Sequence, residues 1–247
     1  MNKDTLAKRK SMPLPKRLLI EGFERLGFEV VKRDPQSNIN VFRKNRTTLE
    51  RFDHIKSLID VGIGTSGTIH LWNAFPDAKL LLIDPLKESE KGVRKAAGRD
   101  PIFFQVGVGS ETGKKSINIP ESPNKSSFYE RTALTAKPTK EVREVDVKTL
   151  DDLVRESGIP TPYGLKIDTE GAELEVLRSG RETLKQCEFV VMEVRHTKSS
   201  FFGGYSLHSL MSEMYYAGFV PSEILNAGET MSDILFERAC EPFGGVS

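Results

Sequence analysis

From Lys56 onward, short apolar runs alternate with amphipathic stretches along the chain. Each apolar run is nearly continuous in hydrophobic residues, which is typical of a strand buried on both faces of a parallel sheet. Alternation of such runs with amphipathic stretches predicts βαβ units, with helices between the strands. We therefore expect a doubly wound α/β domain with parallel strands at residues 57–61, 79–83, 102–106, 164–168 and 188–194.

The end of the chain departs from this alternation. A predicted helix near residues 207–217 precedes two strand-like segments, 219–225 and 232–237, which are joined by the turn Asn226-Ala227-Gly228. This pattern predicts a β-hairpin whose final strand enters the sheet antiparallel. Seven strands ending in a hairpin are the layout of the Rossmann-like class I methyltransferase fold, whereas a dinucleotide-binding Rossmann domain usually has six parallel strands.

Two regions lie outside the regular alternation. Residues 1–55 are predicted to form a tail and a short helical extension, with helices at 13–28 and 40–52, and the domain itself is expected to span residues 56–247. The segment 111–147 is longer than an ordinary crossover. We expect it to contain extra strands at 115–119 and 142–147, with a loop at 126–129 lying over the site.

Charge and hydropathy limit the kinds of partner. The 36 basic and 35 acidic residues leave a net charge of +1, so no global field favours nucleic acid or an anionic membrane. The longest apolar run, 80–83, is far shorter than the roughly 20 residues that span a bilayer. The basic start of the chain lacks the apolar core of a secretory signal, and Cys187 and Cys240 lack metal-ligand spacing. A cytoplasmic protein with reduced cysteines and no transmembrane helix is expected.

A glycine-rich turn follows the first strand, in the segment Ile59-Asp60-Val61-Gly62-Ile63-Gly64-Thr65-Ser66-Gly67. Glycines let a ligand approach the backbone closely, and the start of the next helix offers free N–H groups. This turn is therefore expected to bind a nucleotide-like cofactor. The same glycines satisfy G-x-G-x-x-G, with Asp84 at the usual distance for a ribose contact, so the motif alone leaves S-adenosylmethionine and NAD open.

The next two strands end in further candidates for cofactor contacts. Asp84 and Pro85 stand at the carboxyl end of the second strand, where ligands of doubly wound sheets bind, and a carboxylate can accept both ribose hydroxyls. Gln105, Val106 and Gly107 end the third strand, next to where an adenine would lie. An ordinary exit from the strand explains these three residues equally well, so both interpretations stay open.

Three carboxylates follow the fourth strand, within the run Lys166-Ile167-Asp168-Thr169-Glu170-Gly171-Ala172-Glu173. Carboxylates at the mouth of a buried sheet are costly unless a positive or proton-bearing group lies nearby. Asp168, at the tip of the strand, is therefore a candidate functional residue. Glu170 and Glu173 can alternatively complement the positive N-terminus of the next helix.

This run, together with residues 146–151 and 188–194, resembles the FkbM family of methyltransferases, over roughly residues 56–196. The resemblance implies S-adenosylmethionine as the methyl donor. It also implies a small-molecule or glycan acceptor, usually a hydroxyl on a sugar, polyketide or other natural product. The site residues that it implies are a cofactor loop (Asp60, Gly62, Gly64), a ribose contact (Asp84) and an acidic mouth (Asp168, Glu170, Glu193).

Methyl transfer to a hydroxyl requires alignment of the reactants, exclusion of water and removal of a proton. The candidates for the base are Asp168, Glu193 and His196, the last because a free imidazole titrates near neutral pH. Asp168 and Glu193 can alternatively hold a divalent cation, but direct base catalysis is the preferred hypothesis and no metal is predicted. The predicted catalytic group consists of Asp168, Glu170, Glu193 and His196.

Two loop segments carry aromatic and hydroxyl groups suited to a polar organic acceptor. Ser126, Ser127 and Tyr129 belong to the first, and Phe201 and Tyr205 belong to the second. Ordinary surface loops are the alternative interpretation. Two competing functions also stay open: an NAD-dependent oxidoreductase, motivated by the glycine pattern, and a non-catalytic nucleotide-binding module.

Overall fold

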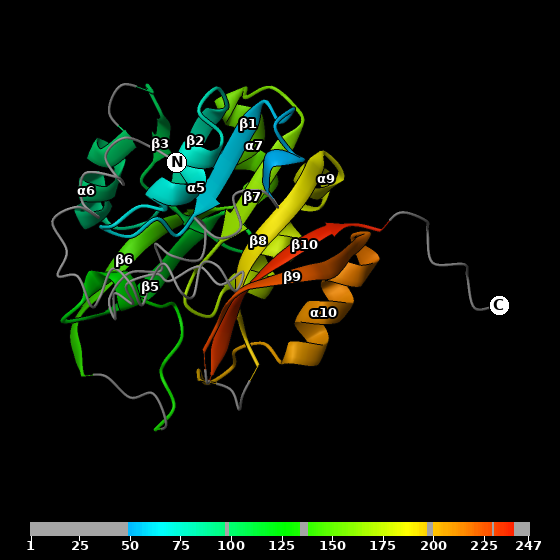
Figure 1. The fold of residues 1–247 in the computed structure, drawn as a ribbon. Coiled ribbons are helices and arrows are strands. Elements are labelled where there is room, and N and C mark those ends of the chain that lie inside the picture. Colours follow the sequence, from blue (N-terminus) through cyan, green and yellow to red (C-terminus); the bar gives the residue numbers. More distant parts are fainter. Residues whose placement is uncertain (1–48, 97–98, 134–137, 197–199, 229, 240–247) are drawn as a thin grey trace, which may run out of the picture. The chain divides into compact units, whose positions relative to one another are not determined.

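A seven-stranded sheet forms the centre of the structure, a computed structural model that describes residues 49–96, 99–133, 138–196, 200–228 and 230–239 (Figure 1). Its strand order is β3-β2-β1-β7-β8-β10-β9, and all pairings are parallel except those of β10 with β8 and β9. This is the class I methyltransferase order that the sequence predicts. The strands are β1 (Ser57–Val61), β2 (Lys79–Ile83), β3 (Ile102–Phe104), β7 (Tyr163–Ile167), β8 (Cys187–Arg195), β9 (Phe219–Ala227) and β10 (Met231–Arg238).

Most predicted strands are confirmed, with shifts of one residue at the ends of β7, β8 and β10 and two larger differences. The predicted third strand was too long: β3 ends at Phe104, because the backbone leaves the sheet at Gln105 and pairs elsewhere from Gly107. The predicted hairpin turn was also misplaced, since Asn226 and Ala227 belong to β9. Asn226 pairs with Asp233 of β10 and donates a side-chain hydrogen bond to its carboxylate, which extends the ladder to the end of both strands.

Helices cover both faces of the sheet, as a doubly wound fold requires. One face packs against α7, α8, α9 and α10 through a core that includes Ile59, Leu165 and Met192. The other face packs against α5 and residues 49–55 through a core that includes Leu58, Trp72 and Phe189. The helices are α5 (Ile69–Ala74), α6 (Glu90–Val93), α7 (Leu150–Ser157), α8 (Glu173–Ser179), α9 (Arg181–Lys185) and α10 (Leu207–Tyr216), with 3-10 turns at Lys87–Ser89, Arg94–Ala96 and Pro123–Lys125.

Local signals explain where α7 begins and ends. The Thr149 side chain accepts a hydrogen bond from the backbone N–H of Asp152, which satisfies one of the unpaired donors of the first turn. Gly158 then ends the helix with a φ of 62°, a conformation that costs a glycine little. The helix therefore ends at Ser157, and the chain turns back to begin β7 at Tyr163.

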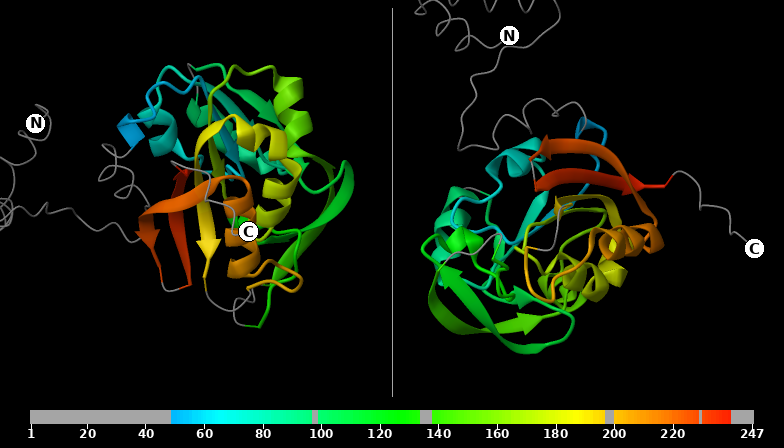
Figure 2. Two further views of the ribbon diagram at one scale, coloured as in Figure 1. Left: turned by 90° about the vertical axis from the view of Figure 1, so that its right-hand side faces the viewer. Right: turned by 90° about the horizontal axis from the view of Figure 1, so that it is seen from below.

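The long insertion forms a second sheet of three strands, in the order β4-β6-β5. These strands are β4 (Gly107–Val108), β5 (Gly113–Pro120) and β6 (Thr139–Lys148). The two extra strands predicted from the sequence are therefore confirmed, and both are longer than expected. Figure 2 shows β5 and β6 as a long curved pair beside the main sheet. Their inner face has a small core of its own, made of Leu86, Ile117, Ile119 and Val145 with Phe128 against it.

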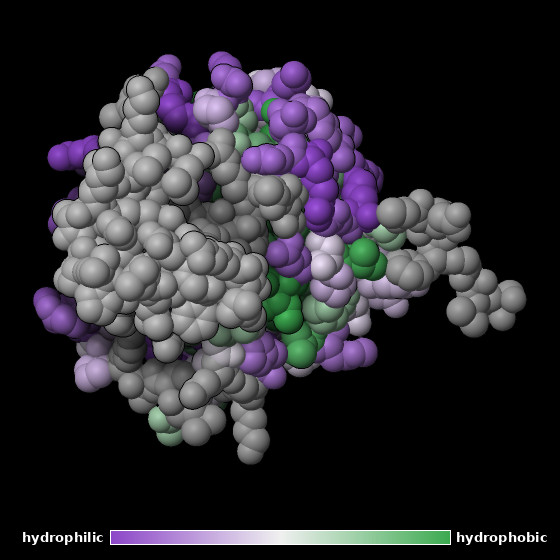
Figure 3. Space-filling model, viewed as in Figure 1, coloured by the Kyte–Doolittle hydropathy of each residue, from purple (hydrophilic) through white to green (hydrophobic). Residues whose placement is uncertain are grey.

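The face of the molecule seen in Figure 3 is mainly polar where its residues are described. Figure 3 shows hydrophilic residues over most of the coloured area, with a smaller hydrophobic area near β9 and β10, where Ile224 is 61% exposed. Within the described ranges, the helices are all too short or too polar to cross a bilayer. Cys187 is a free, buried thiol at the start of β8.

The chain divides into two compact units, Met1–Asn40 and Val41–Ser247. The predicted helix at 13–28 lies outside the described residues, and only the end of the one predicted at 40–52 lies within them. Leu49, Phe52 and Ile55 are buried in the core of the second unit. The predicted boundary after residue 55 therefore lies C-terminal to residues that already pack on the sheet.

Candidate active site

The glycine-rich loop joins β1 to α5 at the carboxyl edge of the sheet. Gly62, Gly64 and Gly67 have φ values of 85°, 53° and 63°, a region that L-residues with a Cβ adopt at a cost. A Cβ on Gly62 would lie 1.9 Å from the carbonyl oxygen of Asp168, so only a glycine fits there. The loop backbone therefore lies directly against the end of β7.

Asp60 lies beneath this loop rather than on its surface. Its side chain is fully buried, and Oδ2 accepts a 2.7 Å hydrogen bond from Nε1 of Trp72. Burial raises the pKa of Asp60, although Lys166, with Nζ 3.7 Å from Oδ1, opposes the shift. In this arrangement Asp60 supports the loop from below, and its direct contact with a cofactor stays a prediction.

Asp84 connects the end of β2 to the same loop. Its Oδ2 accepts from the backbone N–H of Gly64 at 2.9 Å, and Oδ1 accepts from that of Leu86 at 2.9 Å. Burial raises the pKa of this carboxyl. Pro85 follows at the edge of the site and is partly exposed.

The residues after β3 go to two different places. Gln105 is exposed beside Asp84, whose backbone N–H donates to the carbonyl oxygen of Phe104 at 3.2 Å. Val106 and Gly107 are buried and lead into the second sheet, where a Cβ on Gly107 would lie 2.5 Å from the Phe128 ring. Of the three predicted adenine neighbours, Gln105 alone keeps an exposed side chain at this edge of the sheet.

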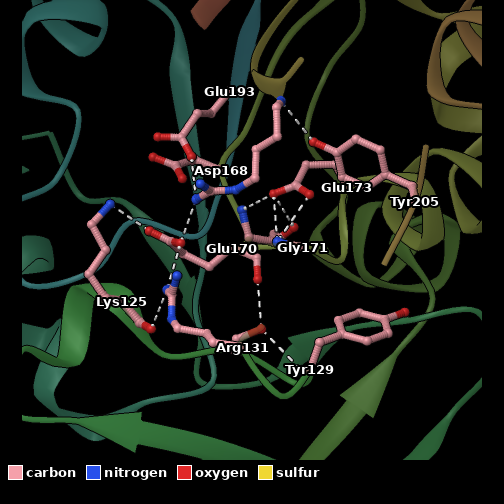
Figure 4. A network of polar contacts seen from close by, with 12 residues as sticks. Lys125, Tyr129, Arg131, Asp168, Glu170, Gly171, Glu173, Glu193 and Tyr205 are labelled. Carbon is pink, nitrogen blue, oxygen red and sulfur yellow. Dashed lines mark hydrogen bonds and ion pairs between the residues drawn. The ribbon is translucent and has the colours of Figure 1, made fainter. Parts of the chain in front are cut away.

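Asp168, Glu170 and Glu193 form a carboxylate cluster across the ends of β7 and β8, with one oxygen of each within 4.8 Å of the others (Figure 4). Asp168 follows β7, and its Oδ2 accepts from Nζ of Lys166 at 3.2 Å. Burial opposes ionisation of Asp168, but Lys166, Lys125 and Arg195 together hold its pKa below the ordinary value. Asp168 is therefore a charged, ion-paired member of the cluster.

Glu170 is held by three cations, as the centre of Figure 4 shows. Its Oε1 accepts from Nζ of Lys125 at 2.6 Å. Its Oε2 accepts from Nη2 of Arg131 at 2.9 Å and from Nη2 of Arg195 at 2.7 Å. The side chain is only 4% exposed, so these ion pairs lie in a low-dielectric environment where breaking one is costly.

The backbone around Glu170 is constrained as well. Its φ of 52° lies in the left-handed region, which a non-glycine residue keeps only where its surroundings enforce it. The Ser127 hydroxyl donates to the carbonyl oxygen of Glu170 at 2.6 Å. The Phe201 ring stacks against both arginines, with its centroid 4.7 Å from Cζ of Arg131 and 5.3 Å from Cζ of Arg195. Glu170 thus joins three segments that are distant in the sequence.

Glu173 takes the structural role that the sequence left open. It begins α8, and its carboxylate accepts from the backbone N–H groups of Thr169 and Gly171 at distances of 3.0 and 3.1 Å. Burial raises the pKa of this carboxyl. It holds the turn between β7 and α8 in place.

Three carboxylates suggest a cation, but the charges around them do not favour one. Both oxygens of Glu170 already face the positive groups of Lys125, Arg131 and Arg195. A divalent ion there would share its site with three positive charges, which is electrostatically unfavourable. The donor set fits an ion-pair network better than a metal centre.

Glu193 and His196 differ sharply in their surroundings, although both were candidates for the base. Glu193 is 13% exposed and accepts from Nη2 of Arg195 at 3.0 Å. Burial, together with the nearby charges of Asp168 and Glu170, raises the pKa of Glu193 to about 8. His196 is exposed, and its Nε2 lies 3.1 Å from Oγ of Ser232 on β10. The structure brings Glu193, but not His196, into the contacts of the carboxylate cluster.

The sequence matches the family model described as Methyltransferase FkbM domain over residues 63–221, which is more than half of the chain and includes β2, β3, β7 and β8 of the main sheet. The chain belongs to the FkbM methyltransferase family. This assignment confirms the resemblance seen in the sequence and makes the protein an S-adenosylmethionine-dependent methyltransferase. The nicotinamide-dependent oxidoreductase and the non-catalytic module are set aside with it.

Two similar proteins have curated descriptions. The 2-O-methyltransferase NoeI of Sinorhizobium fredii is 24% identical over 177 residues, which are 65% of this chain and 71% of that protein. The hexuronic acid methyltransferase AglP of Haloferax volcanii is 28% identical over 156 residues, which are 60% of each chain. The match therefore spans less than two thirds of AglP.

Among solved structures, the magnesium protoporphyrin IX methyltransferase ChlM of Synechocystis PCC 6803 with bound SAM is similar at a TM-score of 0.43 and 10% identity. The match covers 93% of this chain and 99% of that one. The precorrin-6y C5,15-methyltransferase of Geobacter metallireducens gives a TM-score of 0.43 at 10% identity, over 79% and 88% of the two chains. The fold assignment here rests on the strand order of the FkbM chain itself.

The residues of the FkbM site fit S-adenosylmethionine, which supplies an activated methyl group when bound. The oxygens of Asp84 accept from the backbone N–H groups of Gly64 and Leu86 and form a further hydrogen bond with the Ser89 side chain, whereas an ionised carboxylate offers about four acceptor positions. Asp84 therefore keeps capacity for a ribose hydroxyl. The loop from Gly62 to Gly67 packs on the end of β7, so this predicted cofactor loop lies beside the carboxylate cluster.

Several residues of the site were missed in the sequence. Lys166 and Arg195 stand two positions from Asp168 and Glu193 on their strands, so strand alternation was a signal that could have found them. Lys125 and Arg131 lie in the insertion and follow no short-range pattern.

Asn124 is a further missed residue, at the tip of the insertion. Its Oδ1 accepts from the backbone N–H and the hydroxyl of Thr65 at 2.7 and 2.9 Å. Its Nδ2 donates to Oγ of Ser66 at 2.9 Å. Asn124 thus fastens the insertion to the glycine-rich loop, although nothing in the local sequence indicates it.

The two segments predicted to bind the acceptor are placed differently. A cavity of about 170 Å³ is lined by Asn118, Pro120, Lys125, Ser127, Tyr129, Glu130, Arg131 and Thr139. Ser127 and Tyr129 therefore border a cavity, while the buried hydroxyl of Ser126 has no hydrogen-bond partner among the described residues. Phe201 is 3% exposed, the Tyr205 hydroxyl accepts from the Arg195 backbone at 3.2 Å, and neither residue lines the cavity.

Proposed function

We propose that the protein transfers the methyl group of S-adenosylmethionine to a hydroxyl of a sugar acceptor, with hexuronic acids as the first class to test. The observation that carries the proposal is the contact between the glycine-rich loop at Gly62 and the carboxylate cluster at Asp168. Methyl transfer requires donor, acceptor and base within a few ångströms of one another. The descriptions of NoeI and AglP support a sugar-type hydroxyl as the acceptor.

Each part of this edge of the sheet has a role in the proposed reaction. The loop from Gly62 to Gly67 and the carboxylate of Asp84 bind and orient the donor. Asp168 and Glu193 face the reacting groups, while Glu170 keeps the cations of the insertion and of β8 in fixed positions. Fixed polar groups in a partly buried site stabilise developing charge without having to reorganise.

The cavity beneath the insertion supports the location of the acceptor. Its lining is rich in hydroxyl, amide and cationic groups, which suits a polyhydroxylated ligand. Its volume of about 170 Å³ is below the range of roughly 300 to 1,000 Å³ typical of drug-sized ligands, so a single sugar ring is the appropriate scale. Lys125 and Arg131 line this cavity and also bind Glu170, which places the cavity next to the carboxylate cluster.

The proposal is tested with the full chain, methyl-labelled S-adenosylmethionine and a panel of hexuronic acids and neutral hexoses, each free and as an aryl glycoside. We expect labelled product with at least one acidic sugar. Treatment with alkali then separates the two kinds of methylated uronic acid, because a methyl ether survives it and a methyl ester is hydrolysed. Alkali-labile label would contradict transfer to a hydroxyl, and absence of label from every sugar would contradict a sugar acceptor.

A further inference from the structure

The acceptor hydroxyl of the proposed reaction must lose a proton, and the structure separates the groups that could take it. Glu170 is unsuitable, because Lys125, Arg131 and Arg195 occupy both of its oxygens. A carboxylate held by several cations is a poor proton acceptor, since protonation would leave those cations buried and unpaired.

Asp168 and His196 are also disfavoured. Asp168 is paired with Nζ of Lys166 at 3.2 Å, and that lysine is itself buried, at 7% exposure. The Asp168 side chain is itself 33% exposed. Protonating it would take the nearest charged partner from the buried Lys166 ammonium, so this carboxylate favours its charged form. His196 is exposed and hydrogen-bonded to Ser232 on β10, outside the contacts of the cluster.

Glu193 has the opposite surroundings. Its one cationic hydrogen-bond partner among the described residues is Nη2 of Arg195, and that group also binds Glu170. Directly across the ladder, Asp233 of β10 is its register partner. Glu193 is therefore the member of the cluster with the weakest pairing to cations. Carboxylates lie on both sides of it.

We propose that Glu193 is the catalytic base that removes the proton from the acceptor hydroxyl. This assignment rests on the proposed function. The hydroxyl oxygen forms the new C–O bond while the C–S bond of the donor breaks with its electron pair going to sulfur, and the hydroxyl proton goes to a carboxylate oxygen of Glu193. The products are a methyl ether, S-adenosylhomocysteine and protonated Glu193, which then releases its proton to solvent.

The charges around Glu193 suit this role. Burial, Asp168 and Glu170 raise its pKa to about 8, and a base works best when its pKa is near the working pH. A base must be ionised to act, so the rate should rise with pH up to this value and level off above it. The charged groups around Glu193 are Asp168 at the end of β7, Glu170 in the following turn, Arg195 on β8, Asp233 on β10 and Lys125 of the insertion. Lys166 pairs with Asp168 rather than with Glu193.

The test is the pH dependence of single-turnover methyl transfer for the wild type, Glu193→Gln, Glu193→Asp and the matched control Glu188→Gln. Glu188 lies on the same strand, and its side chain is 37% exposed. We expect the wild-type rate to decrease as the pH is lowered below about 8, and we expect Glu188→Gln to show the same pH profile. Glu193→Gln should be slower by about 100-fold or more and should lose this pH dependence, while Glu193→Asp keeps part of both.

The outcomes separate this assignment from the proposed function. A wild-type rate that is constant from about pH 6 to about pH 9 would overturn the assignment of Glu193 as the base, even if no Glu193 variant folds. So would a Glu193→Gln protein that methylates sugars at the wild-type rate. Failure of the wild type to methylate any sugar, with retained binding of S-adenosylhomocysteine, would instead count against the proposed function.

Discussion

Burial raises the pKa of Asp84, which is buried, and of Glu193, which is mostly buried, but the partners of the two carboxylates differ. Asp84 accepts backbone N–H groups that hold both of its oxygens in place. Glu193 accepts from a shared arginine and faces other carboxylates. The first arrangement suits a fixed hydrogen-bond acceptor, and the second suits a group that changes its protonation state during a reaction.

Replacing Asp84 with alanine should weaken binding of S-adenosylhomocysteine by tenfold or more, which is about 1.4 kcal/mol. The ribose would lose its carboxylate, and Gly64 would lose the acceptor that fixes the loop. Calorimetric titration measures the affinity. Asp77→Ala, at an exposed position just before β2, is the control and should leave it unchanged. Equal affinities for the two variants would sink the ribose assignment.

The stability of the wild type should depend on pH through Glu193. Its carboxyl titrates near 8 when folded but near its ordinary 4.5 when unfolded, so between these values the folded protein binds the extra proton. Stability then falls as pH rises through this window. Glu193→Gln has no such carboxyl. Its free energy of unfolding should therefore rise relative to that of the wild type by at most about 1.4 kcal/mol for each pH unit of increase. Urea unfolding at about pH 5, 7 and 9 measures the difference in the free energy of unfolding between Glu193→Gln and the wild type. A difference that stays the same at all three pH values would contradict the prediction.

At the scale of secondary-structure elements, Glu170 connects the parts of the site. It stands in the turn between β7 and α8 and binds the insertion through Lys125 and Arg131 and β8 through Arg195. The insertion also reaches the glycine-rich loop through Asn124. The second sheet is thereby attached to both the donor side and the acceptor side of the proposed site.

Glu170→Gln should cost about 3 to 5 kcal/mol in the free energy of unfolding, because it leaves three cations without their shared buried anion. Denaturant unfolding gives the value. The matched control is Glu182→Gln, which breaks an exposed pair with Lys185 and should cost less than about 1 kcal/mol. Similar losses for the two variants would show that Glu170 is not a structural anchor.

At the scale of the whole molecule, the two cores on opposite faces of one sheet hold the carboxyl ends of β1, β2 and β7 at a common edge. Ligands of open α/β sheets bind at this edge. The FkbM family assignment then decides which nucleotide-like ligand the edge takes.

Saturation with S-adenosylhomocysteine should therefore raise the melting temperature, whereas NAD should not. A ligand at about 100 times its dissociation constant stabilises the folded state by about 2.7 kcal/mol. For a domain of this size that corresponds to a shift of roughly 5 to 10 °C. A thermal shift assay with the two ligands at equal concentration tests this. A shift with NAD but not with S-adenosylhomocysteine would overturn the cofactor assignment.

The sequence alone determined that the strands and the hairpin exist, though not all of their ends, and it determined the family, because these depend on short-range patterns. Buried parallel strands are continuous apolar runs, so β1 and β2 were predicted residue for residue. The loop from Gly62 to Gly67 and the run from Lys166 to Glu173 are each contiguous. Such motifs keep their meaning wherever the rest of the chain goes.

Only the tertiary structure decided how the carboxylates are charged. The partners of Glu170 are 45, 39 and 25 residues away in the sequence, and no periodicity joins them. A pKa depends on burial and on every charge within several ångströms, quantities that exist only once the chain has folded. For this reason the sequence could propose Asp168, Glu193 and His196 together as bases, while only the folded structure shows how their surroundings differ.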